Sequence, residues 1–496
     1  MSIRHSSTGV ALCLDIGTSG ARALVVSAQG RVLGEAGAEY PLFAEEPGQA
    51  EQEPRDWWQG AVGAIRAALA SAGLTRVDGI GVTGQMHGTV LVDERLAPVR
   101  RALLWCDGRA AVDASEVTGR FGRAQIIAAA GNLPMPGFTG PQLRWLTRAG
   151  QLGSARWALC AKDYVRARLT GEVATDPSDA TGTGLLGLDG SWSGELAEAY
   201  GIEPRLLPPV IESGEVAGHL TRAAAAATGL AEGTPVATGA ADNAAAALGT
   251  GVVAPGTLML SVGTSGTILA PMADPRPDET GRCHLLRHAV PGTWYAMAVV
   301  LSAGGALTWW RSVTGRPLDE LSSAAAAVAP GSDGVVMLPF LSGRRMPVVD
   351  PEARAAFCGM SLSHGVGHLT RAVIEGAAFA MKEGLECIRD LGIDDKDAVV
   401  TGGAARHRIW RDVLALALPD LRLATAAPGG GAALGAALLA FAAAGVPLAA
   451  LVHQIVVHAA IDSPRFTDAE YTAVASGYDQ YRSLASTIGS TAAKET

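Results

Sequence analysis

Short apolar runs separated by glycine-rich turns open the chain. Residues 11–38 contain an apolar run, a Gly-Thr-Ser-Gly turn, a second apolar run over residues 23–27, a Gln29-Gly30 turn and a third extended run. This pattern predicts three short strands in a meander. A dinucleotide-binding strand would lead through a G-x-G-x-x-G spacing into a helix, and neither feature follows the first run. The pattern therefore disfavours a dinucleotide site.

After these strands, apolar residues recur every three to four positions, which predicts helices between the strands. An amphipathic helix is expected over residues 54–72, and a strand over residues 77–83 delivers Gly84-Gln85-Met86-His87 at its end. The second half of the chain repeats the scheme. Its predicted strands cover residues 257–262, 267–270 and 398–401, and its predicted helices cover residues 367–391, 407–418 and 432–444.

One strand and turn occurs twice. Residues 12–22 read LCLDIGTSGAR and residues 258–268 read LMLSVGTSGTI, with Asp15 in the first copy where the second has Ser261. A near-repeat at this separation predicts two structurally similar halves. A strand followed by a small, hydroxyl-rich turn can hold phosphate through backbone N–H groups. One such turn alone is more often an ordinary hairpin turn than a phosphate loop, whereas the pair favours phosphate binding.

Composition suits two full-sized lobes, which we expect at residues 8–249 and 250–490. Hydrophobic residues make up 48% of the chain, and the formal net charge of -9 without a basic run excludes a nucleic-acid surface. No lysine follows a glycine, so a Walker-type phosphate loop is absent. Scattered cysteines and an N-terminus without a targeting pattern indicate the cytoplasm. The apolar segment 432–444 is too short to span a membrane and predicts a buried helix.

A set of motifs occurs in the order that one enzyme family shows. The chain reads, in turn, DIGTSGAR at 15–22, GQMHG at 84–88, WCDGR at 105–109, GNLPMPGFTGPQLRW at 131–145, KDY at 162–164, GAADNAAAALG at 239–249, SVGTSG at 261–266, FCGM at 357–360, AVIE at 372–375 and TGGAAR at 401–406. In this ordered set it resembles the FGGY carbohydrate kinases of the actin, sugar kinase and Hsp70 superfamily, and among them the xylulose kinases. The resemblance implies an α/β fold of two RNase H-like lobes, with mixed sheets flanked by helices. It places ATP and sugar in the cleft between a sugar-binding N-terminal lobe and a nucleotide-binding C-terminal lobe.

Phosphoryl transfer from ATP needs neutralised phosphates, a metal, an in-line hydroxyl and a proton acceptor. The resemblance implies Asp242 as the general base, with Mg²⁺ held by Asp15 and Asp242. Amide and imidazole groups that both donate and accept are expected to bind the sugar. These pocket residues are Gln85, Met86, His87 and Asn243. The expected ATP contacts are Gly17, Thr18, Ser19, Arg22, Gly263, Thr264, Ser265, Gly304, Gly402, Gly403 and Ala404.

Several of these residues also have a purely structural interpretation. Asp15 could cap its own turn, Arg22 could be a solvated edge charge, His87 a structural histidine and Asp242 a helix N-cap. An N-cap and a base are compatible roles for Asp242. Trp105, Asp107 and Lys162 stay outside the catalytic set, because an aromatic residue is more often part of the core and a WCDGR turn can simply brace the pocket.

The resemblance implies phosphorylation of a ketopentose, D-xylulose foremost, at the C5 hydroxyl. Another small ketose or polyol, such as ribulose or deoxy-xylulose, and a nonenzymatic sugar sensor of the same fold stay open. Two departures from the family pattern bear on the substrate: Gln142 stands where a lysine is usual, and residues 342–348 read SGRRMPV where SGERTPH is usual. The expected partners are a sugar and ATP, without nucleic acid or membrane, and a homodimer stays open.

Overall fold

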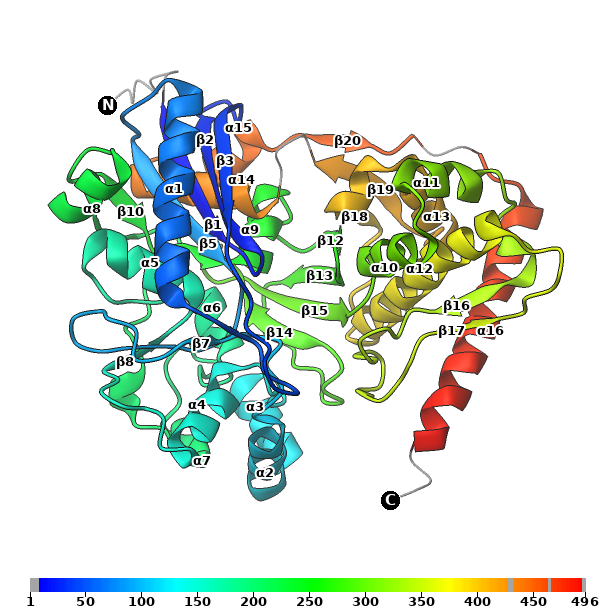
Figure 1. Cartoon of the computed structure of the whole chain (residues 1–496), viewed down its shortest axis with the longest axis horizontal. Helices are drawn as coiled ribbons and strands as arrows, with labels where there is room; N and C mark the ends of the chain where they lie inside the picture. Colours follow the sequence, from blue (N-terminus) through cyan, green and yellow to red (C-terminus); the bar gives the residue numbers. More distant parts are fainter. Residues whose placement is uncertain (1–8, 427–430, 463–464, 493–496) are drawn as a thin grey trace.

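The computed structural model describes residues 9–426, 431–462 and 465–492 and contains two large mixed sheets (Figure 1). The first sheet has the order β3 (Val32–Glu39), β2 (Gly20–Ser27), β1 (Val10–Ile16), β5 (Gly79–Gly84), β10 (Pro235–Ala237), β9 (Val216–His219), with β11 (Ala240–Ala241) also paired to β5. The second sheet has the order β14 (His284–Arg287), β15 (Trp294–Val300), β13 (Gly266–Met272), β12 (Thr257–Val262), β18 (Asp397–Thr401), β19 (Arg422–Ala426), β20 (His458–Ala460).

Helices and small two-stranded pairs complete the structure. The pairs are β4 (Glu51–Gln52) with β7 (Ala102–Leu103), β6 (Val90–Val92) with β8 (Trp157–Leu159), and β16 (Val336–Leu338) with β17 (Ala356–Cys358). The α-helices are α1 (Pro54–Ala72), α2 (Ala111–Phe121), α3 (Arg123–Ala130), α4 (Thr139–Arg148), α5 (Ala161–Thr170), α6 (Pro177–Gly182), α7 (Gly194–Tyr200), α8 (Arg222–Thr228), α9 (Asp242–Gly249), α10 (Gly304–Thr314), α11 (Leu318–Ala326), α12 (Val366–Asp390), α13 (Arg408–Ala417), α14 (Ala432–Ala443), α15 (Leu448–Ile455) and α16 (Asp468–Ala492). Short 3-10 turns cover Pro204–Leu206, Ser332–Gly334 and Gly403–Arg406.

The two sheets share one topology, which confirms the duplication expected from the repeated turn. In the first, β1 pairs antiparallel with β2 and parallel with β5. In the second, β12 pairs antiparallel with β13 and parallel with β18. Beyond β5, the first sheet continues with parallel β10 and then antiparallel β9. Beyond β18, the second sheet continues in the same way with parallel β19 and then antiparallel β20. Strands β1 and β12 each lead into an antiparallel neighbour and not into a helix, so the described part of neither half has the dinucleotide-binding arrangement.

Alternate residues of β1 enter different cores, so the strand is covered on both faces. Leu12 and Leu14 pack in the core cluster that contains α1, whereas Ala11 and Cys13 pack in the cluster that contains α14. Residues that alternate along a strand point to opposite faces of its sheet. Two covered faces account for a strand that is almost continuously apolar.

Helix α14 comes from the second half of the chain but packs on the first sheet. It contacts β1, β5 and α9, and Figure 1 shows this orange helix beside the blue strands. Conversely, apolar residues of α9 share a core cluster with Met259 of β12 and Val399 of β18. Each half therefore contributes a helix near the other half's sheet, while the boundary expected at residues 249–250 stays a prediction.

The predicted elements are largely confirmed. The bounds of α1 and β12 are those expected, and α12, α13 and α14 begin and end within one residue of the predicted ranges. The predicted strand at 77–83 begins two residues later, at Gly79. Within the described ranges, no helix is long and apolar enough to cross a membrane.

Candidate active site

Asp15 lies one residue before the end of β1, between Arg22 of β2 and Thr83 of β5 in the sheet register. Its neighbours Leu14 and Ile16 are fully buried, so the strand is anchored on both sides of the carboxylate. Burial raises the pKa of Asp15 to about 6, against an opposing effect of the Arg22 charge. The carboxylate is thus held in a partly buried position at the start of the GTSG turn.

The first GTSG turn is tied to the predicted sugar pocket through Thr18. The Thr18 hydroxyl donates to Oε1 of Gln85 at 3.1 Å and accepts from the indole N–H of Trp105 at 3.1 Å. The Thr18 carbonyl accepts from Nε2 of Gln52 at 2.7 Å, and Nε2 of Gln85 donates to Oε1 of Gln52 at 3.2 Å. The Thr18 hydroxyl therefore has two protein partners, while Ser19 is exposed. Phosphate contacts by Gly17, Thr18 and Ser19 stay a prediction.

A small pocket lies at the end of β5, where the sequence predicts sugar binding. Gln85 and Met86 are almost fully buried in its wall. Its lining combines amide, imidazole and indole groups with an apolar remainder, and sugar binding by these residues stays a prediction. The pocket is lined by Trp57, Gln85, Met86, His87, Gly88, Thr89, Val90, Leu103, Leu104, Trp105 and Ala161.

His87 is locked as a neutral ring. Its Nδ1 lies 2.6 Å from the carbonyl oxygen of Gly182, and the ring stacks on Phe138 at 4.3 Å between centroids. Burial lowers the pKa of His87 to about 4. Because the carbonyl can only accept, Nδ1 carries the proton and Nε2 keeps a lone pair that can accept from a hydroxyl group. Its backbone φ of 63° is unusual for a residue other than glycine.

Asp242 opens α9 and is oriented by the residue that follows it. Its Oδ1 accepts from the backbone N–H of Asn243 at 2.7 Å and from Nδ2 of Asn243 at 2.9 Å. The same Nδ2 lies 3.5 Å from Sδ of Met86, and Oδ1 of Asn243 lies 3.5 Å from the hydroxyl of Thr267 in β13. Asn243 therefore links the candidate base to the sugar pocket and to the second sheet.

The charges of Asp15 and Asp242 act on each other. Burial raises the pKa of Asp242 to about 7, and the negative charge of Asp15 raises it further. Carboxylate oxygens are ligands that Mg²⁺ prefers, so the chemistry of these two side chains fits the predicted metal. Their binding of Mg²⁺ stays a prediction.

The second GTSG turn is joined by the other predicted nucleotide turns. The N–H groups of Gly304 and Gly305 donate to the carbonyls of Gly263 and Thr264 at 2.8 and 2.9 Å. A Cβ on Gly304 would lie 2.5 Å from the Gly263 oxygen, and one on Gly402 would lie 2.6 Å from the Val262 oxygen. Only glycine permits both approaches. The structure therefore gathers three separate sequence motifs at one place.

Four predicted ATP residues have less support from their surroundings. Arg22 is half exposed, and its Nη2 pairs with Glu35 of β3 at 2.6 Å. Gly403 and Ala404 lie in the 3-10 turn after β18, and Gly403 is exposed. Ser265 closes the second turn by accepting from Gly263 N–H through its carbonyl. Their contacts with ATP stay predictions.

Trp105, Asp107 and Lys162, which stay outside the predicted catalytic set, have different surroundings. Trp105 lines the pocket, whereas the Asp107 carboxylate accepts from Ala50 N–H at 2.9 Å and pairs with Arg109 at 2.7 Å. Lys162 is fully buried among carboxylates. Sequence reasoning did not single out Gln52, Phe138 and Gly182, because each acts through a partner distant in the chain. Phe138 lies within the motif at 131–145, and that motif is the signal that could have found it.

The two departures from the family pattern have structural partners. Buried Gln142 accepts from Thr89 at 2.7 Å and donates to the Leu104 carbonyl at 2.8 Å, so its amide braces the pocket wall. Arg344 pairs with Glu383 of α12 at 2.8 Å, and Nη2 of buried Arg345 lies 3.1 Å from His284.

Comparison with known proteins identifies the family of the chain. The N-terminal domain of the FGGY family of carbohydrate kinases matches residues 10–249, and its C-terminal domain matches residues 258–444. The chain is 37% identical to the xylulose kinase of Klebsiella pneumoniae over 87% of this chain and 89% of that protein. It is 35% identical to the xylulose kinase of Escherichia coli strain K12 over 81% and 83% of the two chains. The structure of a xyloylose kinase from Brucella ovis matches with a TM-score of 0.88 at 34% identity, covering 96% of this chain and 98% of that one.

Both halves of the chain are covered by these matches, and the solved relatives share its architecture over nearly the whole length. Sugar kinases of this family use ATP. The chain therefore belongs to the FGGY family of carbohydrate kinases and is a sugar kinase.

Proposed function

We propose that this kinase phosphorylates a ketopentose, D-xylulose to D-xylulose 5-phosphate, with Asp242 as the general base. The observation that carries the proposal is the position of Asn243, whose amide bonds Oδ1 of Asp242 and lies against Met86 in the predicted sugar pocket. The candidate base and the candidate pocket are thereby joined through one side chain. The relatives named xylulose kinase support the choice of sugar.

The proposed reaction is a direct transfer of the γ-phosphoryl group from ATP to the sugar. The sugar hydroxyl oxygen attacks the γ-phosphorus of ATP, the bond to the ADP oxygen breaks, and the Asp242 carboxylate accepts the hydroxyl proton. A carboxylate with a pKa near neutrality can accept a proton in the transition state and release it to solvent afterwards. Neutral His87, with Nε2 free to accept, and Gln85 would bind other hydroxyls of the sugar.

Asp15, with Asp242 nearby, would hold Mg²⁺. When bound, the ion supplies positive charge that neutralises phosphate oxygens. The glycine turns at Gly263, Gly304 and Gly402 would receive ATP in the C-terminal lobe, and the N-terminal lobe would receive the sugar. We place the enzyme in the cytoplasm, because the cysteines of the described residues form no disulfide. A homodimer stays a prediction.

Sugar-dependent release of ADP tests the proposal, with Asp242→Asn beside the unmodified enzyme. We expect xylulose to be preferred in a panel containing ribulose, deoxy-xylulose, glycerol and gluconate. Asp242→Asn keeps the side-chain volume but cannot accept the proton, so kcat should fall by about 10²–10⁴-fold. Asp274→Asn on an exposed loop is the matched control and should keep full activity.

Two results would contradict different parts of the proposal. Turnover of xylulose by Asp242→Asn at the unmodified rate would remove Asp242 as the base. Efficient phosphorylation of another sugar in the panel, with none of xylulose, would leave the kinase chemistry in place and change only the substrate.

A further inference from the structure

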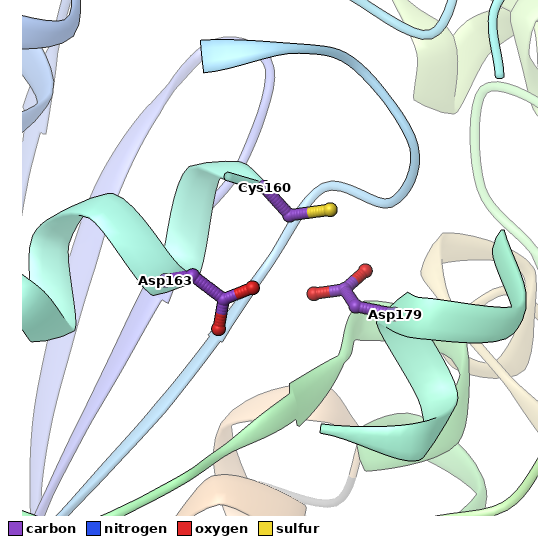
Figure 2. A group of neighbouring side chains, drawn as sticks. All are labelled: Cys160, Asp163 and Asp179. Carbon is purple, nitrogen blue, oxygen red and sulfur yellow. The ribbon is translucent and has the colours of Figure 1, made fainter. Parts of the chain in front are cut away.

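A buried ionic cluster lies between α5 and α6, and α6 contacts β11, the strand that precedes Asp242. Figure 2 shows Cys160 and Asp163 at the start of α5 and Asp179 on α6, with their polar ends converging. Their donor atoms lie within 4.8 Å of one another, a spacing that could hold a metal ion. However, Nζ of Lys162 lies 2.6 Å from Asp163 and 3.2 Å from Asp179. The ammonium group therefore already supplies positive charge to this cluster, and the buried Arg166 guanidinium, 3.7 Å from Asp163, adds to it.

Lys162 also holds a third carboxylate, which leads toward the active site. Its Nζ lies 2.9 Å from Oδ1 of Asp176, and both side chains are fully buried. The other oxygen of Asp176, Oδ2, accepts from the hydroxyls of Ser178 at 2.6 Å and Ser213 at 2.7 Å. A buried ion pair needs such additional hydrogen bonds to offset the cost of removing the charges from water.

The direction of these hydrogen bonds is set by the charge on Asp176. An ionised carboxylate can only accept, so the hydroxyl proton of Ser178 is committed to Oδ2 and its lone pairs are free. One of them accepts the backbone N–H of Ala241 at 2.9 Å. Ala241 ends β11 and is the residue immediately before Asp242. Lys162, Asp176 and Ser178 thus form an ordered chain to the backbone that carries the candidate base.

We propose that Lys162, Asp176 and Ser178 are positioning residues that hold the start of α9, so that the Asp242 carboxylate meets the sugar hydroxyl in reactive geometry. The inference rests on the proposed role of Asp242. Among the described residues, only Asn243 hydrogen-bonds the side chain of Asp242, so the placement of the carboxylate depends strongly on its backbone. A displacement of about 1 Å at a reacting group can lower a rate by about 10²-fold.

The chain offers a matched pair of variants to test this network. Ser178 and Ser213 are both fully buried and both donate to Asp176, but among the two only Ser178 also contacts Ala241. We expect Ser178→Ala to lower kcat by about tenfold, with the KM for ATP within about twofold of the unmodified value. Ser213→Ala should keep at least about half of the unmodified kcat, because it leaves the Ala241 contact intact.

Amide hydrogen exchange gives a readout that does not depend on activity. The segment containing Ala241 should exchange faster in Ser178→Ala than in Ser213→Ala. If Ser178→Ala does not fold, Asp176→Asn takes its place, since an amide that donates to Ser178 would turn the hydroxyl proton toward Ala241 N–H. We expect that variant to lose kcat and to exchange faster at Ala241.

Equal loss of kcat in the two serine variants, or unchanged kcat and exchange in Ser178→Ala, would overturn the positioning role. Asp242→Asn is measured in parallel to separate this inference from the proposed function. An inactive Asp242→Asn beside a fully active Ser178→Ala defeats only the network. An active Asp242→Asn defeats the assignment of the base, and the network then loses its catalytic purpose.

Discussion

Buried histidines show how a single side chain can be confined to one protonation state. In His288, Nε2 lies 3.0 Å from the Val252 carbonyl, and Nδ1 accepts the N–H of Val290 at 3.0 Å. Both ring nitrogens therefore have partners that require the neutral form, with the proton on Nε2. Burial lowers the pKa of His288 to about 4.

The stability of the protein should consequently fall in mild acid through His288. An unfolded chain binds a proton at this residue near pH 6.5, whereas the folded protein does so only near pH 4. The stabilisation is complete above pH 6.5 and declines as the pH falls toward 4, by about 2 kcal/mol between pH 7.5 and 5.0. Urea unfolding of the unmodified protein and of His288→Gln at both pH values measures the difference.

The variant lacks the titrating ring, so its free energy of unfolding should lose about 2 kcal/mol less over that interval. Contributions of carboxylates elsewhere are shared by both proteins and cancel in the comparison. An equal loss in the two proteins would show that His288 does not titrate as its surroundings require.

At the scale of elements, the packing of β5 against α14 depends on glycines, which have no side chain to hold the two elements apart. A Cβ on Gly79 would lie 2.2 Å from the Ala440 carbonyl oxygen, and a Cβ on Gly81 would lie 1.8 Å from that of Ala436. On the other side of α14, a Cβ on Gly435 would lie 1.9 Å from the carbonyl oxygen of Ala245 in α9. Glycines thus let one helix lie close to a strand and to another helix at once.

Two Gly→Ala substitutions should therefore have opposite effects. Gly81→Ala forces β5 and α14 apart and should destabilise the protein by about 3 kcal/mol. Gly63 lies on the exposed face of α1, where a new methyl group would meet no atom within 4 Å. Gly63→Ala should therefore stabilise the protein by about 0.5–1 kcal/mol. Denaturant midpoints of both variants measure these changes, and a Gly81→Ala protein as stable as the unmodified one would disprove the close approach.

At the scale of the whole molecule, the side chain of one asparagine, Asn132, hydrogen-bonds both backbone groups of a residue in the other half, much as a neighbouring strand would. Nδ2 of Asn132 donates to the Leu285 carbonyl at 2.6 Å, and the N–H of Leu285 donates to Oδ1 of Asn132 at 2.9 Å. Asn132 follows α3 in the first half, and Leu285 lies on β14 of the second sheet. The N–H of Arg287, also on β14, donates to Thr181 of α6 at 3.1 Å. The first half is thereby bonded directly to β14.

Replacing Asn132 should weaken this junction. Asn132→Ala removes the two buried hydrogen bonds to Leu285, together with one to the Ala130 carbonyl. It leaves both backbone groups of Leu285 without their partner, which should cost about 2–4 kcal/mol. Thermal unfolding measures the loss. Thr181→Val is a milder comparison because it removes only one bond at the same junction, and equal stability of Asn132→Ala and the unmodified protein would contradict the bonding role.

The local parts of the site could be predicted because they depend on residues close together in the chain. Alternating and helical periods place β1, β12 and α1, and the GTSG turns follow from glycine and hydroxyl residues at fixed offsets. Family motifs directed attention to Asp15 and Asp242, whose charges do act on each other in the structure.

The partners of these residues could not be predicted, because they come from segments far apart in the sequence. Gly182 meets His87, which lies 95 positions away, only once α6 has packed beside the β5 turn. The link from Lys162 to Ala241 likewise needs α5, α6 and β11 to pack together. Periodicity and turn chemistry act over a few residues and suffice to specify the repeated strands and their turns. Which faces of the helices and sheets pack together depends on the total apolar surface that the whole chain buries. This long-range packing places α14 on the first sheet and brings Asp242 within reach of the charge of Asp15.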